Sequence, residues 1–290
     1  GVERFVGDLS RPETLKDVVK DLDLVVHLGG LMTALTSNEF ERVNGQGTQH
    51  LVAACAELES PPVFILISSI AAAGTSGDHL RNEMDPVHPI SNYGRSKRTG
   101  ELAAAAAADR VPVTIMRPPF VFGGFYIFRP VKRFGIHPVP GMRHRRKISL
   151  IHAEDLATSI LLAAHGGTRV DATDANRSSF SQGCYFVADD ATPLYSDLGD
   201  MIGAAVGRAS VVKLPVPDTL ARTLGGIATM VSKLRGRPGV FSLDKAREGA
   251  AGSWTCSTEK IKQELHFKTS VSLEDRLQAT VDWYLEHRWF

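Results

Sequence analysis

Residues 63–69 read Val-Phe-Ile-Leu-Ile-Ser-Ser, five apolar residues followed by two serines. A continuously apolar run of this length predicts a strand covered on both faces, as in a parallel sheet. Residues 22–28 (Leu-Asp-Leu-Val-Val-His-Leu) predict a second buried strand, and residues 112–116 (Pro-Val-Thr-Ile-Met) a third. Helical patterns follow the strands 22–28 and 63–69, over 38–58 and from Ser91 or Asn92 to about Asp109. This alternation predicts a doubly wound parallel α/β sheet with right-handed crossovers.

The regular alternation of strands and helices ends near Pro118. Glycine, proline and aromatic residues are frequent over 118–141, and a basic run follows at 143–147. Further elements are expected as helices at 154–164, up to Val206 and at 273–287, and as strands at 2–6 and 184–187. The second half of the chain is therefore expected to form a smaller α/β region beside the sheet.

Composition excludes several classes of partner. The net charge of +1 predicts no electrostatic attraction to nucleic acid or to anionic membranes. No secretory signal and no run of about eighteen apolar residues is present, so we expect no stable membrane insertion and a cytoplasmic location. The apolar segment 220–234 could lie on a membrane surface or form a helix that covers a pocket. Cys55, Cys184 and Cys256 are widely spaced, which favours buried free thiols and no metal site.

Tyr93 and Lys97 are spaced to share one face of the helix that begins near Ser91. A free tyrosine titrates near pH 10, and a neighbouring ammonium lowers that pKa by favouring the phenolate. A serine hydroxyl from a strand end can orient a carbonyl or an alcohol against the phenol. Ser68 and Ser69, the glycines 29–30 and residues 117–119 all follow predicted strands, where ligands bind in such sheets. The pattern predicts a proton-transfer site.

Taken in chain order, these motifs resemble those of the extended short-chain dehydrogenase/reductase family over nearly the whole chain. The resemblance implies that Ser69, Tyr93 and Lys97 are catalytic, with Tyr93 as general acid/base. It implies a bound NAD or NADP, a choice that this sequence does not reveal. The residues implied in cofactor binding are Asp8 and Leu9, Leu28, Gly29 and Gly30, Asn44, Ser68, Tyr93, Lys97 and Pro118. By the same resemblance, Asn44 supports the backbone of the active site.

The family's opening Gly-x-x-Gly-x-x-Gly turn is absent from the sequence. The resemblance therefore implies an N-terminally truncated chain that lacks the first two strands of the Rossmann sheet. From this we expect an open apolar sheet edge and weak NAD(P) binding. Residues 1–120 are assigned to a partial Rossmann domain. Residues 121–290 are assigned mainly to a substrate-binding region, with some elements returning to the sheet.

The substrate is expected to be a small molecule. Ile148 stands where nucleotide-sugar epimerases of the family carry an arginine, although Arg145 and Arg146 lie nearby. Ser69-Ile70-Ala71 replaces the Thr-Asp-Glu of sugar dehydratases. Residues 117–122 resemble the 3β-hydroxysteroid dehydrogenase and dihydroflavonol reductase branch, which implies alcohol–ketone interconversion on an apolar ring substrate.

Three questions remain open: the alternative function, the role of two phenylalanines and the role of the basic run. The protein could be a nucleotide-sugar epimerase, or a catalytically silent NAD(P)-binding or interaction protein. Phe120 and Phe122 could line the substrate pocket or fill the core, and the basic run 143–147 could bind an anion or form a solvated loop. The family resemblance also implies a possible homodimer through the helices 38–58 and 92–109.

Overall fold

The computed structural model describes residues 1–123, 128–141 and 145–289. Its main sheet has four parallel strands in the order β1-β2-β3-β7. Three of them confirm the strands expected in the first half, and the fourth confirms the one expected near residue 184. Their bounds are Leu24–His27 for β1, Val63–Ile67 for β2, Val113–Arg117 for β3 and Cys184–Phe186 for β7. In register, Val26 pairs with Ile65, Ile65 with Thr114 and Ile115 with Cys184.

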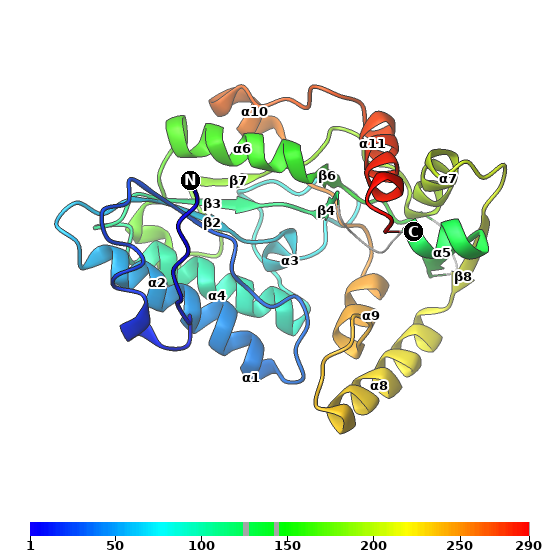
Figure 1. The fold of residues 1–290 in the computed structure, drawn as a ribbon, viewed down its shortest axis with the longest axis horizontal. Helices are drawn as coiled ribbons and strands as arrows, with labels where there is room; N and C mark the ends of the chain where they lie inside the picture. Colours follow the sequence, from blue (N-terminus) through cyan, green and yellow to red (C-terminus); the bar gives the residue numbers. More distant parts are fainter. Residues whose placement is uncertain (124–127, 142–144, 290) are drawn as a thin grey trace.

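Helices cover both faces of this sheet, as expected for a Rossmann-like fold (Figure 1). On one face lie α1 (Ser37–Phe40), α2 (Gly47–Ala56) and α4 (Asn92–Ala106), with a π-helical turn at Glu41–Gln46 between α1 and α2. On the other lie α6 (Ala153–Gly166) and α10 (Glu259–Leu265). The helices expected over 38–58, 91–109 and 154–164 are confirmed, the first with that π-helical turn inside it.

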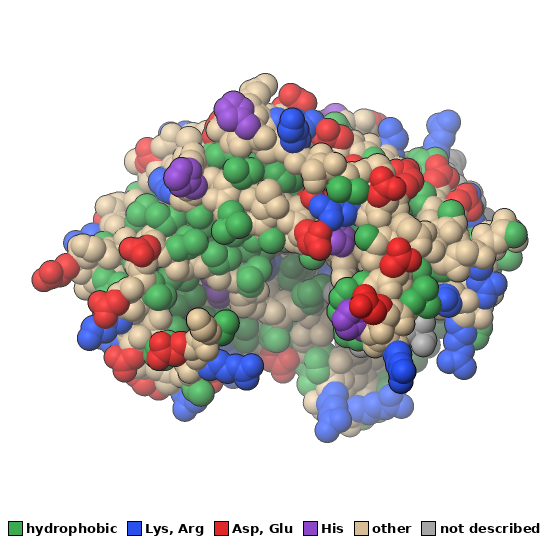
Figure 2. Space-filling model, turned by 45° about the horizontal axis from the view of Figure 1, so that its top comes forward, with side chains coloured by type: hydrophobic (Ala, Val, Ile, Leu, Met, Phe, Trp, Pro, Cys, Tyr) green, Lys and Arg blue, Asp and Glu red, His purple; other side chains and the backbone are tan. Residues whose placement is uncertain are grey.

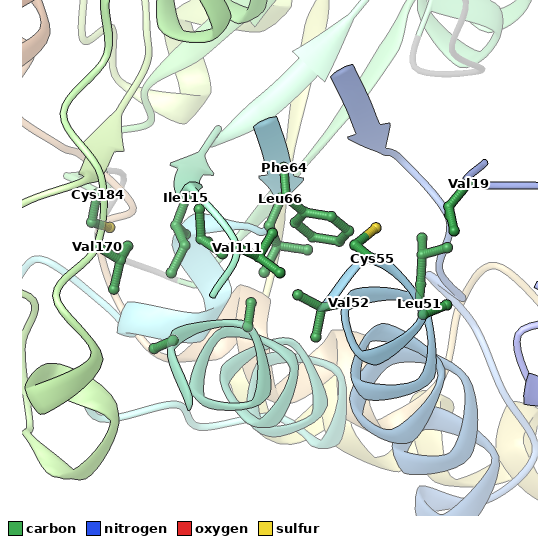
Figure 3. Packing of buried hydrophobic residues seen from close by; sticks show 14 of the residues in the cluster. Val19, Leu51, Val52, Cys55, Phe64, Leu66, Val111, Ile115, Val170 and Cys184 are labelled. Atoms are coloured by element: carbon green, nitrogen blue, oxygen red, sulfur yellow. The ribbon is translucent and has the colours of Figure 1, made fainter. Parts of the chain in front are cut away.

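The apolar run 63–67 supplies both cores because its side chains alternate between the faces. Phe64 and Leu66 pack with Leu51, Val52 and Cys55 of α2 (Figure 3). Ile65 and Ile67 belong to the opposite core, with Ile160 of α6 and Ile261 of α10. A strand buried on both faces favours apolar residues at successive positions, which explains the absence of alternation in this run.

The strand expected at Val2–Val6 is wrong. In the part of the chain that the structure describes, no strand pairs with this segment, and Val2 and Val6 are 93% and 96% exposed. An extended segment needs a hydrogen-bonded neighbour to become part of a sheet. β1 is the outermost strand on its side, and Leu22 and Leu28 beside it are exposed. Figure 2 shows hydrophobic side chains gathered on the half of the molecule that holds this sheet.

The remaining elements form a smaller α/β region around a separate core that includes Phe122, Phe128, Leu198 and Tyr284. It contains two parallel pairs, β4 (Phe120–Phe122) with β6 (Leu150–His152) and β5 (Ile136–Pro140) with β8 (Val212–Val216). Its helices are α5 (Phe128–Phe134), α7 (Tyr195–Ala205), α8 (Asp218–Arg235), α9 (Leu243–Ala250) and α11 (Leu273–Glu286). The helices expected up to Val206 and at 273–287 are confirmed as α7 and α11. α3 (Ile70–Ala73) and the 3-10 turns Pro12–Thr14 and Ala172–Asn176 complete the chain.

Candidate active site

The site begins where β2 ends. Ser69 is the N-cap of α3, and its Oγ accepts a hydrogen bond from Ala71 N–H at 3.1 Å. The next backbone group, Ile70 N–H, donates to the carbonyl of Pro118 at 2.9 Å. The parallel topology thus ties the loops after β2 and β3 together at one edge of the sheet, with the Ser69 side chain at that edge.

Tyr93 is brought to Ser69 by a close helix contact. α4 starts after Ser91, whose Oγ accepts from Gly94 N–H at 2.9 Å. Gly94 lies directly against the carbonyl of Ala71 in α3, and a Cβ at this position would overlap that oxygen. Only glycine allows this backbone approach. The contact brings the Tyr93 phenol beside Ser69, whose side chain acts to lower the pKa of that phenol.

Lys97 lies one helical turn after Tyr93 and is buried. Its Nζ donates to the carbonyl of Ile67 at the end of β2, at 2.6 Å. Burial lowers the pKa of Lys97 to about 8, against the opposing charge of Glu101. An ammonium has three donors, so this contact leaves Lys97 with donors for a ligand.

Asn44 connects the loop after β1 to α4, the helix that carries Tyr93 and is called the tyrosine helix below. Its Oδ1 accepts from Leu31 N–H at 2.7 Å, and its Nδ2 donates to Leu31 O at 3.0 Å and to Ser96 Oγ at 2.9 Å. The space beside Gly30 is narrow, because a Cβ at this position would lie 3.0 Å from Asn44 Oδ1 and 3.7 Å from Lys97 Nζ. The glycine loop therefore runs past the lysine, and the π-helical turn that holds Asn44 is of a kind often found at functional sites.

The other residues implied in cofactor binding extend away from this point. Leu9 lies against Gly29, because a Cβ added at Gly29 would lie 3.1 Å from the side chain of Leu9. Leu28 is exposed on the same loop. The Asp8 carboxylate accepts from Ser10 N–H at 2.8 Å and from Ser10 Oγ. The Ser68 hydroxyl is buried and donates to Glu101 at 2.6 Å.

Phe120 and Phe122 divide between two environments. Phe122 is fully buried in the core of the smaller region, with its ring 5.2 Å from that of His152. Phe120 is half-buried at the edge of that core. In the basic run, Arg143 and His144 lie outside the described residues. Arg146 forms an ion pair with Asp218 at 2.7 Å, so this part of the run is engaged within the protein.

The pKa of Tyr93 differs from the expectation. Burial raises it to about 12, the side chain of Ser69 acts in the opposite direction, and the charge of Glu248 adds to the rise. The sequence predicts a lowered value through Lys97. That effect is absent because Lys97 Nζ contacts the carbonyl of Ile67, while Tyr93 lies beside a carboxylate. Tyr93 is accordingly a neutral phenol in this state.

The residues beside Tyr93 on α9 are missed by sequence reasoning. The Asp244 carboxylate accepts from the backbone N–H groups of Asn92 at 2.8 Å and Tyr93 at 3.2 Å. Lys245 Nζ lies 4.5 Å from the centre of the Tyr93 ring, and Glu248 Oε1 accepts from Ser91 Oγ at 2.5 Å. No local spacing in the sequence signals these contacts.

A buried ion cluster behind the site is also missed. The Glu101 carboxylate accepts hydrogen bonds from Arg117 Nε and Nη2, both at 2.8 Å, and from Arg98 Nη1 at 3.0 Å. Although burial acts to raise the pKa of Glu101, Arg117 and its other partners hold it below the ordinary value. Glu101 lies four residues after Lys97, so reading the same helix face one turn further would have found it.

Metal and membrane features are limited in what the structure describes. Within residues 1–123, 128–141 and 145–289, no group of three or more His, Cys, Asp or Glu side chains could hold a metal ion. The three cysteines are free and buried, as expected. None of the helices described here combines the length and apolarity needed to cross a bilayer.

The parallel sheet, covered by helices on both faces, defines the fold of the extended short-chain dehydrogenases/reductases, and Ser69, Tyr93 and Lys97 meet at its carboxyl edge. Residues 2–174 match the model of the NAD dependent epimerase/dehydratase family, and the chain belongs to that family.

Two curated relatives and one solved structure illustrate the similarity. The chain is 30% identical to a ceramide reductase of Caulobacter vibrioides over 99% of this chain and 82% of the relative. It is 24% identical to a decarboxylating sterol-4-alpha-carboxylate 3-dehydrogenase of Candida albicans, over 98% and 83%. A dTDP-glucose 4,6-dehydratase from Streptomyces venezuelae, solved with NAD and TYD bound, superimposes with a TM-score of 0.73 at 20% identity, over 98% of this chain and 80% of that one. At that identity the last comparison concerns the fold alone.

Proposed function

We propose that this protein is an NAD(P)-dependent oxidoreductase that interconverts an alcohol and a ketone on an apolar substrate, with Tyr93 as general acid/base. The observation that carries the proposal is the meeting of Tyr93 and Ser69 at the end of β2, with Lys97 one turn away on α4 and Gly30 beside Lys97. A phenol and a serine hydroxyl that meet at one point can both bind the reacting oxygen.

The protonation state of Tyr93 favours one direction of proton transfer. With a pKa of about 12, Tyr93 carries its proton at neutral pH and can donate it to a carbonyl oxygen as the carbonyl is reduced. Ser69 orients the same oxygen. In the reverse direction the phenolate has to form first, and a charged Lys97 closer to the ring would favour it.

The nicotinamide half of the cofactor fits the groups around Gly30. A side chain at Gly30 would fill the space between Asn44 Oδ1 and Lys97 Nζ, so glycine leaves this space open. Lys97 and Tyr93 would hold the nicotinamide ribose. Gly29, Leu28 and Leu9 would follow the cofactor, Asp8 would reach its adenine end, and Ser68 and Pro118 would border the nicotinamide. When bound, the nicotinamide supplies or accepts the hydride.

Two relatives support an apolar substrate. Their names, ceramide reductase and sterol-4-alpha-carboxylate 3-dehydrogenase, describe a reduction and a dehydrogenation of lipids. A nucleotide-sugar epimerase is the alternative, because a dTDP-glucose 4,6-dehydratase of Streptomyces niveus is 26% identical. Against it, Ile148 replaces the arginine expected to grip a diphosphate, and nearby Arg146 is paired with Asp218.

The test follows NAD(P)H absorbance, at cofactor concentrations raised to allow for the weak NAD(P) binding expected, with a panel containing a sterol ketone, a long-chain lipid ketone and a nucleotide sugar. We expect turnover of an apolar ketone and a loss of about 10²–10⁴-fold in kcat for Tyr93→Phe. Tyr195→Phe, the same change on α7, is the matched control. Turnover of the nucleotide sugar alone would support the epimerase. A wild type and a Tyr93→Phe variant equally inert on the whole panel would support a silent binding protein.

Location and assembly belong to the same proposal. The free, buried cysteines support the expected cytoplasmic location. Light scattering on the sample used for the assay tests the expected homodimer.

A further inference from the structure

Among the described residues, α8 packs on α9 through one side. A Cβ at Gly225 would lie 2.9 Å from the Cβ of Ala246 in α9, and Thr229 Oγ1 accepts from Leu243 N–H at 2.9 Å. Gly225 and Thr229 are four residues apart and so mark the side of α8 that faces α9. α9 in turn contacts the start of α4 through Asp244. α9 therefore lies between α8 and the tyrosine helix.

The opposite side of α8 is an exposed apolar stripe. Its members are Leu220, Leu224, Ile227, Met230 and Leu234, with exposed fractions from 46% at Leu224 to 81% at Leu234. At 3.6 residues per turn, their mean direction is about 180° around the helix from Gly225 and Thr229. The stripe thus faces away from α9 and the tyrosine helix. Figure 1 shows α8 at the lower right of the molecule, outside α9. Val240 and Phe241 in the following loop are exposed as well.

Only positive charges accompany this stripe. Between Asp218 and Asp244 the sequence has no acidic residue, and the basic residues are Arg222, Lys233, Arg235 and Arg237. All four are exposed, and none forms an ion pair with another described residue. Asp218 itself is paired with Arg146. A segment of charge +4 in a chain of net charge +1 is a local concentration of charge that the composition as a whole conceals.

From this arrangement we infer that α8 and the loop residues 240–241 dock the protein on the surface of an anionic lipid bilayer. A helix with an exposed apolar side and basic residues around it lies in the plane of the membrane interface, with its apolar side chains among the lipids. Anionic head groups attract basic side chains near the surface, and Arg235 and Arg237 follow Leu234 at the C-terminal end of the stripe. A second copy of the chain fits less well, because a two-fold contact through the stripe would place two copies of this basic segment against each other. The inference goes beyond the proposed reaction, and α9 joins the docked helix to the helix of Tyr93.

The experiment is co-sedimentation of the protein with vesicles. One set contains phosphatidylcholine alone and the other phosphatidylcholine mixed with phosphatidylglycerol. We expect binding to the second set, weakened by added salt. Ile227→Asp should weaken binding at least about tenfold, because it removes an apolar side chain that the docked helix would bury in the bilayer. Arg235→Gln and Arg237→Gln should each weaken it about fivefold.

Leu161→Asp is the matched control, since Leu161 is 65% exposed on α6, away from the stripe. Circular dichroism checks the fold of each variant, and the two arginine variants keep the test informative if an aspartate variant unfolds. Activity on a water-soluble ketone should be unchanged by Ile227→Asp, which separates docking from catalysis.

The inference is overturned if the wild type binds neither set of vesicles, or if Leu161→Asp and Ile227→Asp weaken binding equally. A dimer in light scattering that Ile227→Asp dissociates, together with no vesicle binding, would assign the stripe to a second copy and also overturn it.

Discussion

The carboxylate of Asp244 accepts a hydrogen bond from the backbone N–H of Tyr93, 151 residues earlier in the chain. With its second oxygen on Asn92 N–H, Asp244 satisfies two of the free donors in the first turn of α4. A negative charge at this end also complements the helix dipole. The smaller region therefore fixes the start of the helix that carries the proposed acid.

Loss of this cap should be measurable in stability. We expect Asp244→Ala to lower the free energy of unfolding by about 1 kcal/mol, because two backbone donors lose their acceptor. Urea denaturation provides the measurement. Asp109→Ala, at an exposed aspartate close to the other end of α4, is the control and should have a smaller effect. Equal losses for both variants would contradict a specific role of Asp244.

Glu248 should influence the titration of Tyr93. Its negative charge disfavours the phenolate and adds to the raised pKa that burial produces. Glu248→Gln keeps an acceptor for Ser91 but removes the charge, so the pKa of Tyr93 should fall. The pH profile of alcohol oxidation should then rise at lower pH, and an ultraviolet titration of the phenol should shift the same way. Glu274→Gln on α11 should leave both unchanged.

Lys97 should make stability depend on pH in alkaline solution. The folded protein releases this proton near pH 8, whereas the unfolded chain keeps it to about pH 10.5. Because the unfolded state then binds more protons, stability should rise between these values, by up to about 3 kcal/mol. Tyr93 has the opposite effect, but only from pH 10 to about 12. Unfolding measured from pH 8 to 10 should show the rise in wild type.

Lys97→Met should abolish that rise, since no proton is then lost on folding. Lys16→Met, at a lysine with 62% exposure paired with Glu57, should keep it. A rise that persists unchanged in Lys97→Met would show that another group causes it.

The ion pair between Glu101 and Arg117 should be costly to break. Both side chains are fully buried, so Glu101→Gln leaves Arg117 and Arg98 without the carboxylate that they share. We expect a loss of about 3–5 kcal/mol in the free energy of unfolding. Combining Glu101→Leu with Arg117→Met should cost less than the two single changes added. Glu57→Gln, in the exposed pair with Lys16, should cost no more than about 1 kcal/mol.

Much of the fold and of the candidate site is legible in local sequence. The apolar run 63–67 specifies a strand buried on both faces. Successive side chains of a strand point to opposite faces, so a continuous apolar run makes both faces apolar. The spacing of Tyr93 and Lys97 places them on one helix face, and parallel strands end at one sheet edge. These relations depend on backbone geometry that every chain shares, so they predicted the sheet, the main helices and the proximity of Ser69 to Tyr93.

The remaining features depended on which surfaces meet. Residues 2–6 are apolar enough for a strand, yet a strand forms only where a neighbour offers hydrogen bonds. The raised pKa of Tyr93 follows from its burial and from Glu248, and neither is encoded near residue 93. Likewise, the amphipathic pattern of 220–234 predicts a helix, but only the packing of Gly225 and Thr229 on α9 shows which side stays exposed. The sequence alone determined the elements and the groups at the site, because periodicity and spacing are local. Only the tertiary structure decided their protonation, their caps and their free surfaces, because burial and charge act between residues far apart in the chain.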